Sequence, residues 1–167
     1  MLGEKAIAQL PDDALFWQYN GESNSISVIV KHMVGNMLSR FTDFLTTDGE
    51  KHWRNRDDEF KNSFTSREEL LASWDKGWDC LFGALAELTD YHLEDVIYIR
   101  NDGHTIIEAL NRQLTHYAYH IGQIVYIAKM IRDSDWESLS IPRNTSNAYN
   151  SRKFGQEKIK RHFTDDL

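Results

Sequence analysis

Three long stretches of the chain carry apolar residues three and four positions apart, the spacing that places them on one face of an α-helix. They cover residues 25–45, 66–88 and 105–132. Each is long enough for about five to eight helical turns, which is typical of a helical bundle rather than of a mixed fold. The pattern therefore predicts an all-α protein built around three long helices.

The starts of the second and third helices carry a recognisable signal. Ser66 is followed three positions later by Glu69, and Thr105 is followed by Glu108 in the same way. In this capping box the hydroxyl and the carboxylate each bond to a backbone N–H at the helix start. The two pairs predict helices that begin at residues 66 and 105.

The N-terminus contains a much shorter helical pattern. Residues 2–10 correspond to the last turns of a helix, which Pro11 would stop. A fourth bundle helix of this length would leave part of the apolar core uncovered. Either the first helix is trimmed in this sequence, or a second copy of the chain covers that surface, and we expect a homodimer.

Two connections also have predictable features. Residues 46–65 are too many for a tight turn, so the helices on either side are expected to run parallel, joined by a crossover. Residues 96–99 (VIYI) form a brief strand, followed by a turn at residues 101–103 (NDG). The candidate partner strand is residues 138–141, which would make a two-stranded appendage to the bundle.

Length and composition restrict the class of protein. The chain has 167 residues, 41% hydrophobic and 27% charged, which suits one folded domain over residues 1–167 with an irregular tail from about residue 142. Its 26 acidic and 19 basic residues give a net charge of -7, which argues against a nucleic-acid partner. No apolar run suggests a membrane span or a secretory signal, so we expect a cytoplasmic protein.

Two of the seven histidines suggest a metal site. His116 and His120 lie one helical turn apart on the flank of the apolar stripe, where both imidazoles can reach one ion. A third ligand should come from a facing helix, and His32 is the candidate there. A helical wheel places His32 about 120° from the centre of its stripe, so this position leaves a polar cleft and a solvated face equally open.

The other four histidines fall in expected loops or the tail and are interpreted as surface residues; they are His52, His92, His104 and His162. No Glu follows His116, and no Glu stands three residues before any histidine, so the patterns of zinc proteases and di-iron bundles are absent. Cys80, the single cysteine, has only Lys76 as a preceding basic neighbour and is interpreted as a packed thiol.

These segments together resemble the DinB/YfiT-like superfamily, and within it a bacterial branch of unknown function. The resemblance extends from Trp17 to Tyr149 and is carried by residues 24–37 (NSISVIVKHMVGNM), 46–51 (TTDGEK), 104–105 (HT) and 116–124 (HYAYHIGQI). It implies a four-helix bundle with up-down-down-up connections, often dimeric. It also implies a metal held by His32 from the second helix and by His116 and His120 from the fourth. The short first helix departs from this pattern.

The expected function follows from the metal. One divalent ion, zinc or nickel, on three imidazoles would keep an open position and activate a thiol or a water molecule. The substrate would be a small molecule, and some relatives use a low-molecular-weight thiol. Arg40 falls towards the apolar stripe and either binds an anionic substrate or extends to a surface carboxylate. The alternative is a non-catalytic protein with a structural metal or a ligand-binding cleft.

Overall fold

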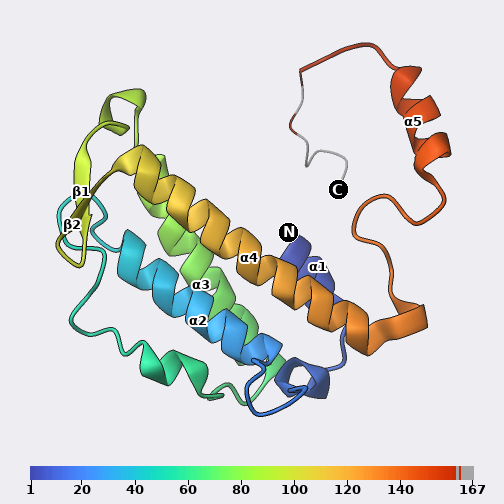
Figure 1. Cartoon of the computed structure of the whole chain (residues 1–167), viewed down its shortest axis with the longest axis horizontal. Helices are drawn as coiled ribbons and strands as arrows, with labels where there is room; N and C mark the ends of the chain where they lie inside the picture. Colours follow the sequence, from blue (N-terminus) through green and yellow to red (C-terminus); the bar gives the residue numbers. More distant parts are fainter. Residues whose placement is uncertain (161, 163–167) are drawn as a thin grey trace.

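The structure is a computed structural model of the chain, and it describes residues 1–160 and 162. This part of the chain is rich in helix and also contains one small antiparallel sheet, as Figure 1 shows. The α-helices are α1 (Leu2–Ala8), α2 (Ile26–Phe41), α3 (Arg67–Ala86), α4 (Ile106–Arg132) and α5 (Ser146–Phe154). The strands are β1 (Val96–Ile99) and β2 (Asp102–Thr105), and short 3-10 helices include η1 (Asp13–Phe16) and η2 (Asp57–Phe60).

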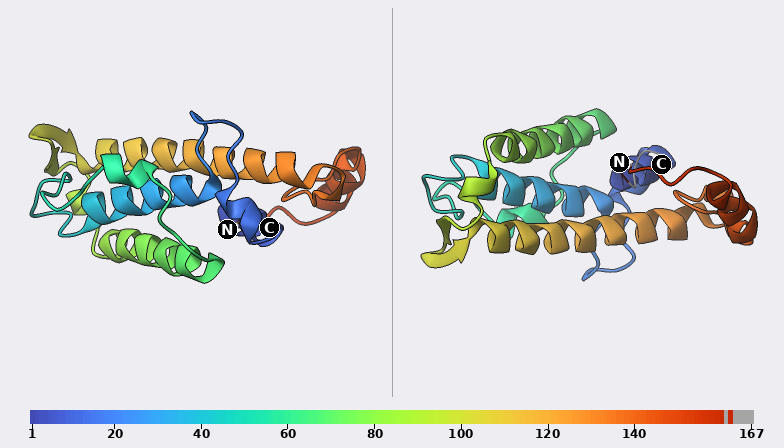
Figure 2. Two further views of the ribbon diagram at one scale, coloured as in Figure 1. Left: turned by 90° about the horizontal axis from the view of Figure 1, so that it is seen from below. Right: turned by 90° about the horizontal axis from the view of Figure 1, so that it is seen from above.

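The three long helices lie side by side. Helices α2 and α3 run in the same direction and α4 runs in the opposite one, which Figures 1 and 2 show from three sides. The long connection that joins α2 to α3 contains η2 and is a crossover, as its length predicted. Gly77 lets α3 approach α2 closely, because a Cβ atom there would lie 3.1 Å from Met37 Sδ.

Helix α2 is the central helix of the group. It packs against α3, α4, η1 and η2, and thirteen of its sixteen residues are buried. Its neighbours in the core include Leu15, Trp74 and Ile124. Burial on nearly every side means that α2 has no broad solvated face, so even its polar residues are enclosed.

The predicted helix starts are close to those observed. Thr105 and Glu108 form the full capping box at the start of α4. At the start of α3, the Ser66 hydroxyl accepts a hydrogen bond from the Glu69 backbone N–H at 3.2 Å. The Glu69 carboxylate bonds to the backbone N–H and the hydroxyl of Thr65 instead of to Ser66, so only half of the predicted box forms.

The predicted partner of the first strand is wrong. Val96–Ile99 pair with Asp102–Thr105 in an antiparallel hairpin, and not with residues 138–141. Arg100 and Asn101 form the turn with positive φ angles of 57° and 65°. Such angles at both central positions are typical of the two-residue turns that match the twist of a hairpin. The strand therefore pairs with the residues that immediately follow it.

The chain ends differ from the core in packing. The tail was expected to be irregular from about residue 142, but Ser146–Phe154 form α5, which has no buried residue. Helix α1 is short, as predicted, and it packs against α4.

Phe82 of α3 and Leu114 of α4 are exposed apolar residues on the long helices. In the described part of the chain, no helix combines the length and apolar character needed to cross a membrane.

Candidate metal centre

Three histidine side chains from two helices converge on one point. His32 comes from α2, and His116 and His120 come from α4. The Nε2 atom of His116 lies 3.3 Å from that of His32 and 3.1 Å from that of His120. These three residues are the one group of potential metal ligands found among the described residues. The structure thus brings together all three histidines that the sequence indicated.

The spacing of the nitrogen atoms fits a shared metal ion. Imidazole nitrogens bind zinc at about 2.0–2.1 Å in a roughly tetrahedral arrangement, which places neighbouring nitrogens about 3.3 Å apart. The two observed Nε2 separations agree with this value. Imidazoles that face one another through unprotonated nitrogens lack donors and repel one another when charged, whereas a divalent cation satisfies all three.

Hydrogen bonds at Nδ1, the ring nitrogen on the side away from the cluster, fix the orientation of His32 and His120. His32 Nδ1 lies 2.9 Å from Glu59 Oε2, and His120 Nδ1 lies 3.2 Å from Gln123 Oε1. Both partners are acceptors, so each Nδ1 carries the proton and each Nε2 presents a lone pair to the cluster. Metal-binding histidines are normally oriented in this way.

Glu59 is itself held in place by a buried arginine. Arg54 donates to Glu59 Oε1 from Nε at 2.7 Å and to Glu59 Oε2 from Nη2 at 3.0 Å. Burial alone would raise the pKa of the Glu59 carboxyl, but hydrogen bonds from His32 and Arg54 and the charge of Arg54 hold it below its usual value. Glu59 is therefore an ionised carboxylate behind His32.

Gly35 makes room for this carboxylate. A Cβ atom at Gly35 would lie 2.7 Å from Glu59 Cδ, closer than side-chain atoms can approach. Gly35 sits inside α2, where glycine is less favourable than alanine by about 1 kcal/mol. The close approach of Glu59 gives a physical reason for glycine at this position.

Burial favours the uncharged forms of His116 and His120. Burial lowers the pKa of His116 to about 4, with further contributions from the neighbouring His120 and His32. Burial also lowers the pKa of His120 and outweighs the hydrogen bond to Gln123, which acts in the opposite direction. Neutral imidazoles are the form that binds a metal, so protons compete weakly for these two nitrogens near neutral pH.

Aromatic rings enclose the cluster on its outer side. Phe60 stacks on His32 with ring centroids 4.9 Å apart, and Tyr119 lies beside His120 at 5.0 Å. Deeper in the protein, the buried Tyr117 donates a hydrogen bond to Asn36 Oδ1 at 2.9 Å. Burial raises the pKa of Tyr117, which suits a structural hydrogen bond rather than acid catalysis.

Arg40 hydrogen-bonds to the segment that follows α2. Its Nη1 donates to the backbone carbonyl of Gly49 and, at 3.0 Å, to Glu50 Oε2. Glu50 also accepts from Arg54 and Arg100. Arg40 therefore pairs with a carboxylate, which was one of the two expectations for this side chain. None of these contacts supports the other expectation, the binding of an anionic substrate.

The remaining candidates lie outside the cluster. His52 and His162 are exposed, His92 accepts a hydrogen bond from the Thr89 backbone N–H, and His104 lies 3.5 Å from Arg112 Nη1. Cys80 is half-buried, and its Sγ lies 3.7 Å from Thr42 Oγ1. These contacts agree with the interpretation of Cys80 as a packed thiol.

Sequence reasoning missed three functional neighbours. Glu59 and Arg54 lie in the crossover, where no periodic pattern points to their contacts. Gln123 follows His120 by three positions on the same helix, and this spacing was a usable signal for a side-chain contact. Glu59 and Gln123 contact two of the histidine rings, and Arg54 contacts Glu59.

The fold and the cluster define a helical protein with a three-histidine site. The chain belongs to a family described as protein of unknown function (DUF1572), whose model matches residues 1–145. Neither the curated proteins nor the solved structures contain a match to this chain. The family match includes every helix that contributes to the cluster, whereas the broader DinB/YfiT-like resemblance stays a prediction.

Proposed function

We propose that His32, His116 and His120 bind one divalent metal ion, zinc or nickel, and that the chain uses it to activate a thiol or water nucleophile. The observation that carries this proposal is the convergence of three Nε2 atoms at separations of 3.1 and 3.3 Å. The hydrogen bonds of Glu59 and Gln123 to the opposite ring nitrogens support it.

The ligand set favours an open site. Within the described residues, the group contains three histidines and no fourth protein ligand. A divalent ion on three neutral imidazoles would supply a Lewis acid with a vacant position, which lowers the pKa of a bound thiol or water. A structural metal would normally have four protein ligands, so the composition of the group favours the catalytic proposal.

We further propose that α1 to α4 form a shortened DinB-like bundle with up-down-down-up connections. The parallel course of α2 and α3 and the opposite course of α4 support this proposal. So does the position of the ligands, since one comes from the second helix and two from the fourth. The short α1 would be the main departure from such a bundle.

Cobalt substitution tests the proposed function. One equivalent of Co²⁺ should give the visible absorption of a low-coordinate nitrogen site, and a small thiol such as mercaptoethanol should shift the spectrum and add a thiolate charge-transfer band. A bound spectrum that the thiol does not change would support a structural metal instead. Absence of saturable Co²⁺ binding would reject both forms of the metal site.

A further inference from the structure

A groove lies along α2 and α4, the two helices that carry the histidine cluster. It has a volume of about 670 Å³ and is formed by the segment from Trp17 to Asn24, by α2 at Ile29 and by the second half of α4. Ile29 precedes His32 by three positions, and Gln123 follows His120 by three. At 1.5 Å per residue, both positions lie about 4.5 Å along their helices from the metal ligands.

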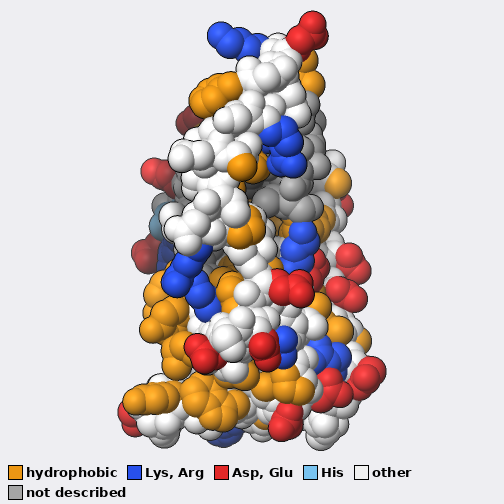
Figure 3. Space-filling model, turned by 90° about the vertical axis from the view of Figure 1, so that its right-hand side faces the viewer, with side chains coloured by type: hydrophobic (Ala, Val, Ile, Leu, Met, Phe, Trp, Pro, Cys, Tyr) orange, Lys and Arg blue, Asp and Glu red, His pale blue; other side chains and the backbone are white. Residues whose placement is uncertain are grey.

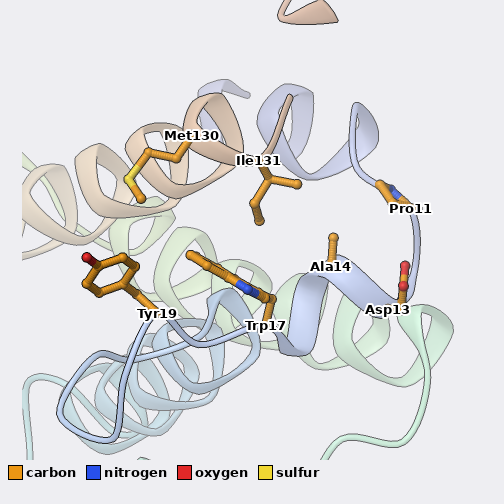
Figure 4. Close-up of a pocket in the computed structure, with 7 residues that line it drawn as sticks. All are labelled: Pro11, Asp13, Ala14, Trp17, Tyr19, Met130 and Ile131. Atoms are coloured by element: carbon orange, nitrogen blue, oxygen red, sulfur yellow. The ribbon is translucent and has the colours of Figure 1, made fainter. Parts of the chain in front are cut away.

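The groove continues into a second hollow on the same side of α4. The two share Trp17, Tyr19 and Met130, and the second has a volume of about 540 Å³. Figure 4 shows Trp17 and Tyr19 facing Met130 and Ile131 of α4 across this space. Binding sites for small molecules commonly have volumes of about 300–1,000 Å³, so either hollow is large enough.

Large aromatic and apolar side chains form much of the groove wall. Trp17, Tyr19, Tyr119, Tyr126 and Met130 all line it and remain between 40% and 71% exposed. Figure 3 views the side of the molecule that carries α5 and the end of α4, and hydrophobic side chains gather on the lower part of that face. A contiguous exposed apolar patch of this kind marks a binding surface more often than scattered single residues do.

The charge of the walls restricts the ligand. Among the residues that the structure describes, no Lys or Arg lines either hollow, and the charged residues there are Asp13 and Glu22. Aromatic faces and carboxylates attract cations and disfavour anions. The groove is therefore suited to an uncharged or positively charged apolar molecule.

Two residues connect the groove to the metal centre. Gln123 lines the groove while its Oε1 accepts the hydrogen bond from His120 Nδ1. Its amide group can donate a hydrogen bond to a bound molecule. Tyr119 lines the groove and packs against the ring of His120. A ligand in the groove would thus lie against two side chains that contact His120.

We propose that this groove is the substrate site and that it binds a small apolar, aromatic molecule that is uncharged or cationic, with its reactive end towards the histidine cluster. The placement of the reactive end rests on the proposed function, whereas binding in the groove does not. The two parts can therefore fail separately.

Three probes with one ring system test the charge preference: naphthylmethylamine, naphthylmethanol and naphthoate. Titrations followed by probe fluorescence should show that the amine and the alcohol bind at least about tenfold more tightly than the carboxylate. Tyr126→Ser and Met130→Glu, both at exposed positions, should each weaken binding of the alcohol about tenfold or more, because they remove apolar wall area. Tyr91→Ser, at an exposed tyrosine outside the groove, is the matched control and should leave binding unchanged.

Metal-loaded protein tests the orientation. Protons of the bound amine should relax faster in Co²⁺-loaded than in Zn²⁺-loaded protein, because a paramagnetic ion affects only nearby nuclei. His116→Ala should remove Co²⁺ uptake yet leave probe binding in place, so loss of the metal site would not imitate loss of the groove. Equal affinity for all three probes, or binding that survives both groove variants, would overturn the proposal. Probe binding without any Co²⁺ effect on relaxation would overturn the orientation alone.

Discussion

Glu59 Oε2 lies 2.9 Å from Nδ1 of His32, although the two residues are 27 positions apart and Glu59 belongs to the crossover between α2 and α3. The carboxylate thereby fixes which nitrogen of His32 faces the other two histidines. A connection between helices thus contributes to the geometry of a candidate site whose histidines lie on helices.

Replacing the carboxylate should weaken metal binding without removing a ligand. Glu59→Gln keeps the size of the side chain but removes the charge that pairs with Arg54 and polarises His32. We expect zinc affinity to fall about 10–100-fold, as is typical when the partner of a metal-bound histidine is changed. Competition with a chromophoric chelator measures the change.

The matched control is Glu87→Gln, at an exposed glutamate that ends α3. It removes the same charge at a distance from the cluster and should leave zinc affinity unchanged. If both variants bound zinc like the unmodified chain, the role assigned to Glu59 would be wrong.

Gly35→Ala should impair the same contact from the other side. The added methyl group would displace the Glu59 carboxylate, so zinc affinity should fall by about tenfold or more. In a Glu59→Ala background the same substitution should have little further effect, because the group that it displaces is gone. Zinc competition on the four proteins of this cycle measures the coupling.

Gly83→Ala serves as the control for helix propensity. Gly83 lies on an exposed part of α3, and a Cβ atom there would meet no atom within 4 Å. This substitution should stabilise the protein by up to about 1 kcal/mol and leave zinc affinity unchanged. Additive effects of Gly35→Ala and Glu59→Ala on zinc affinity would contradict the proposed steric link.

Asp48 should make the stability of the protein depend on acid pH. Burial by itself raises the pKa of Asp48, but hydrogen bonds from the backbone amides of Asn101, Glu50 and Arg100 outweigh it and lower the pKa. Because the pKa is lower in the folded than in the unfolded chain, the stabilisation is present above the ordinary pKa and is lost as pH falls through the folded value.

Thermal unfolding from about pH 6 to about pH 3 should therefore show a smaller loss of stability for Asp48→Asn than for the unmodified chain. At neutral pH the variant should be less stable by roughly 1–2 kcal/mol, since it weakens hydrogen bonds to a charged acceptor. Parallel pH profiles for the two proteins would show that Asp48 does not hold the hairpin turn through its charge.

Much of the helical structure could be predicted from local sequence. Apolar spacing located α2, α3 and α4, and the box of Thr105 and Glu108 fixed the start of α4, because these signals act within a few residues. The partner of β1 could not be read in this way. The Asn-Asp-Gly signal suggested a turn at residues 101–103, yet Asp102 and Gly103 pair back onto β1.

The three histidines of the candidate site were predictable from the sequence, whereas their surroundings were not. His116 and His120 share a helix, so their spacing alone predicts that the two side chains lie close together. The helical wheel understated His32 because it assumes one buried and one solvated face, whereas α2 is enclosed on nearly every side. Glu59 and Arg54 reach the cluster through the long crossover, and no local rule predicts contacts made by such a segment.

A zinc-binding isotherm of the unmodified chain and of His32→Ala, His116→Ala and His120→Ala tests the central claim most directly. The account predicts one tightly bound zinc ion per unmodified chain and a loss of at least about 100-fold in affinity for each variant, with helical content preserved. Retention of full affinity by any one of the three variants would contradict a site shared by all three imidazoles.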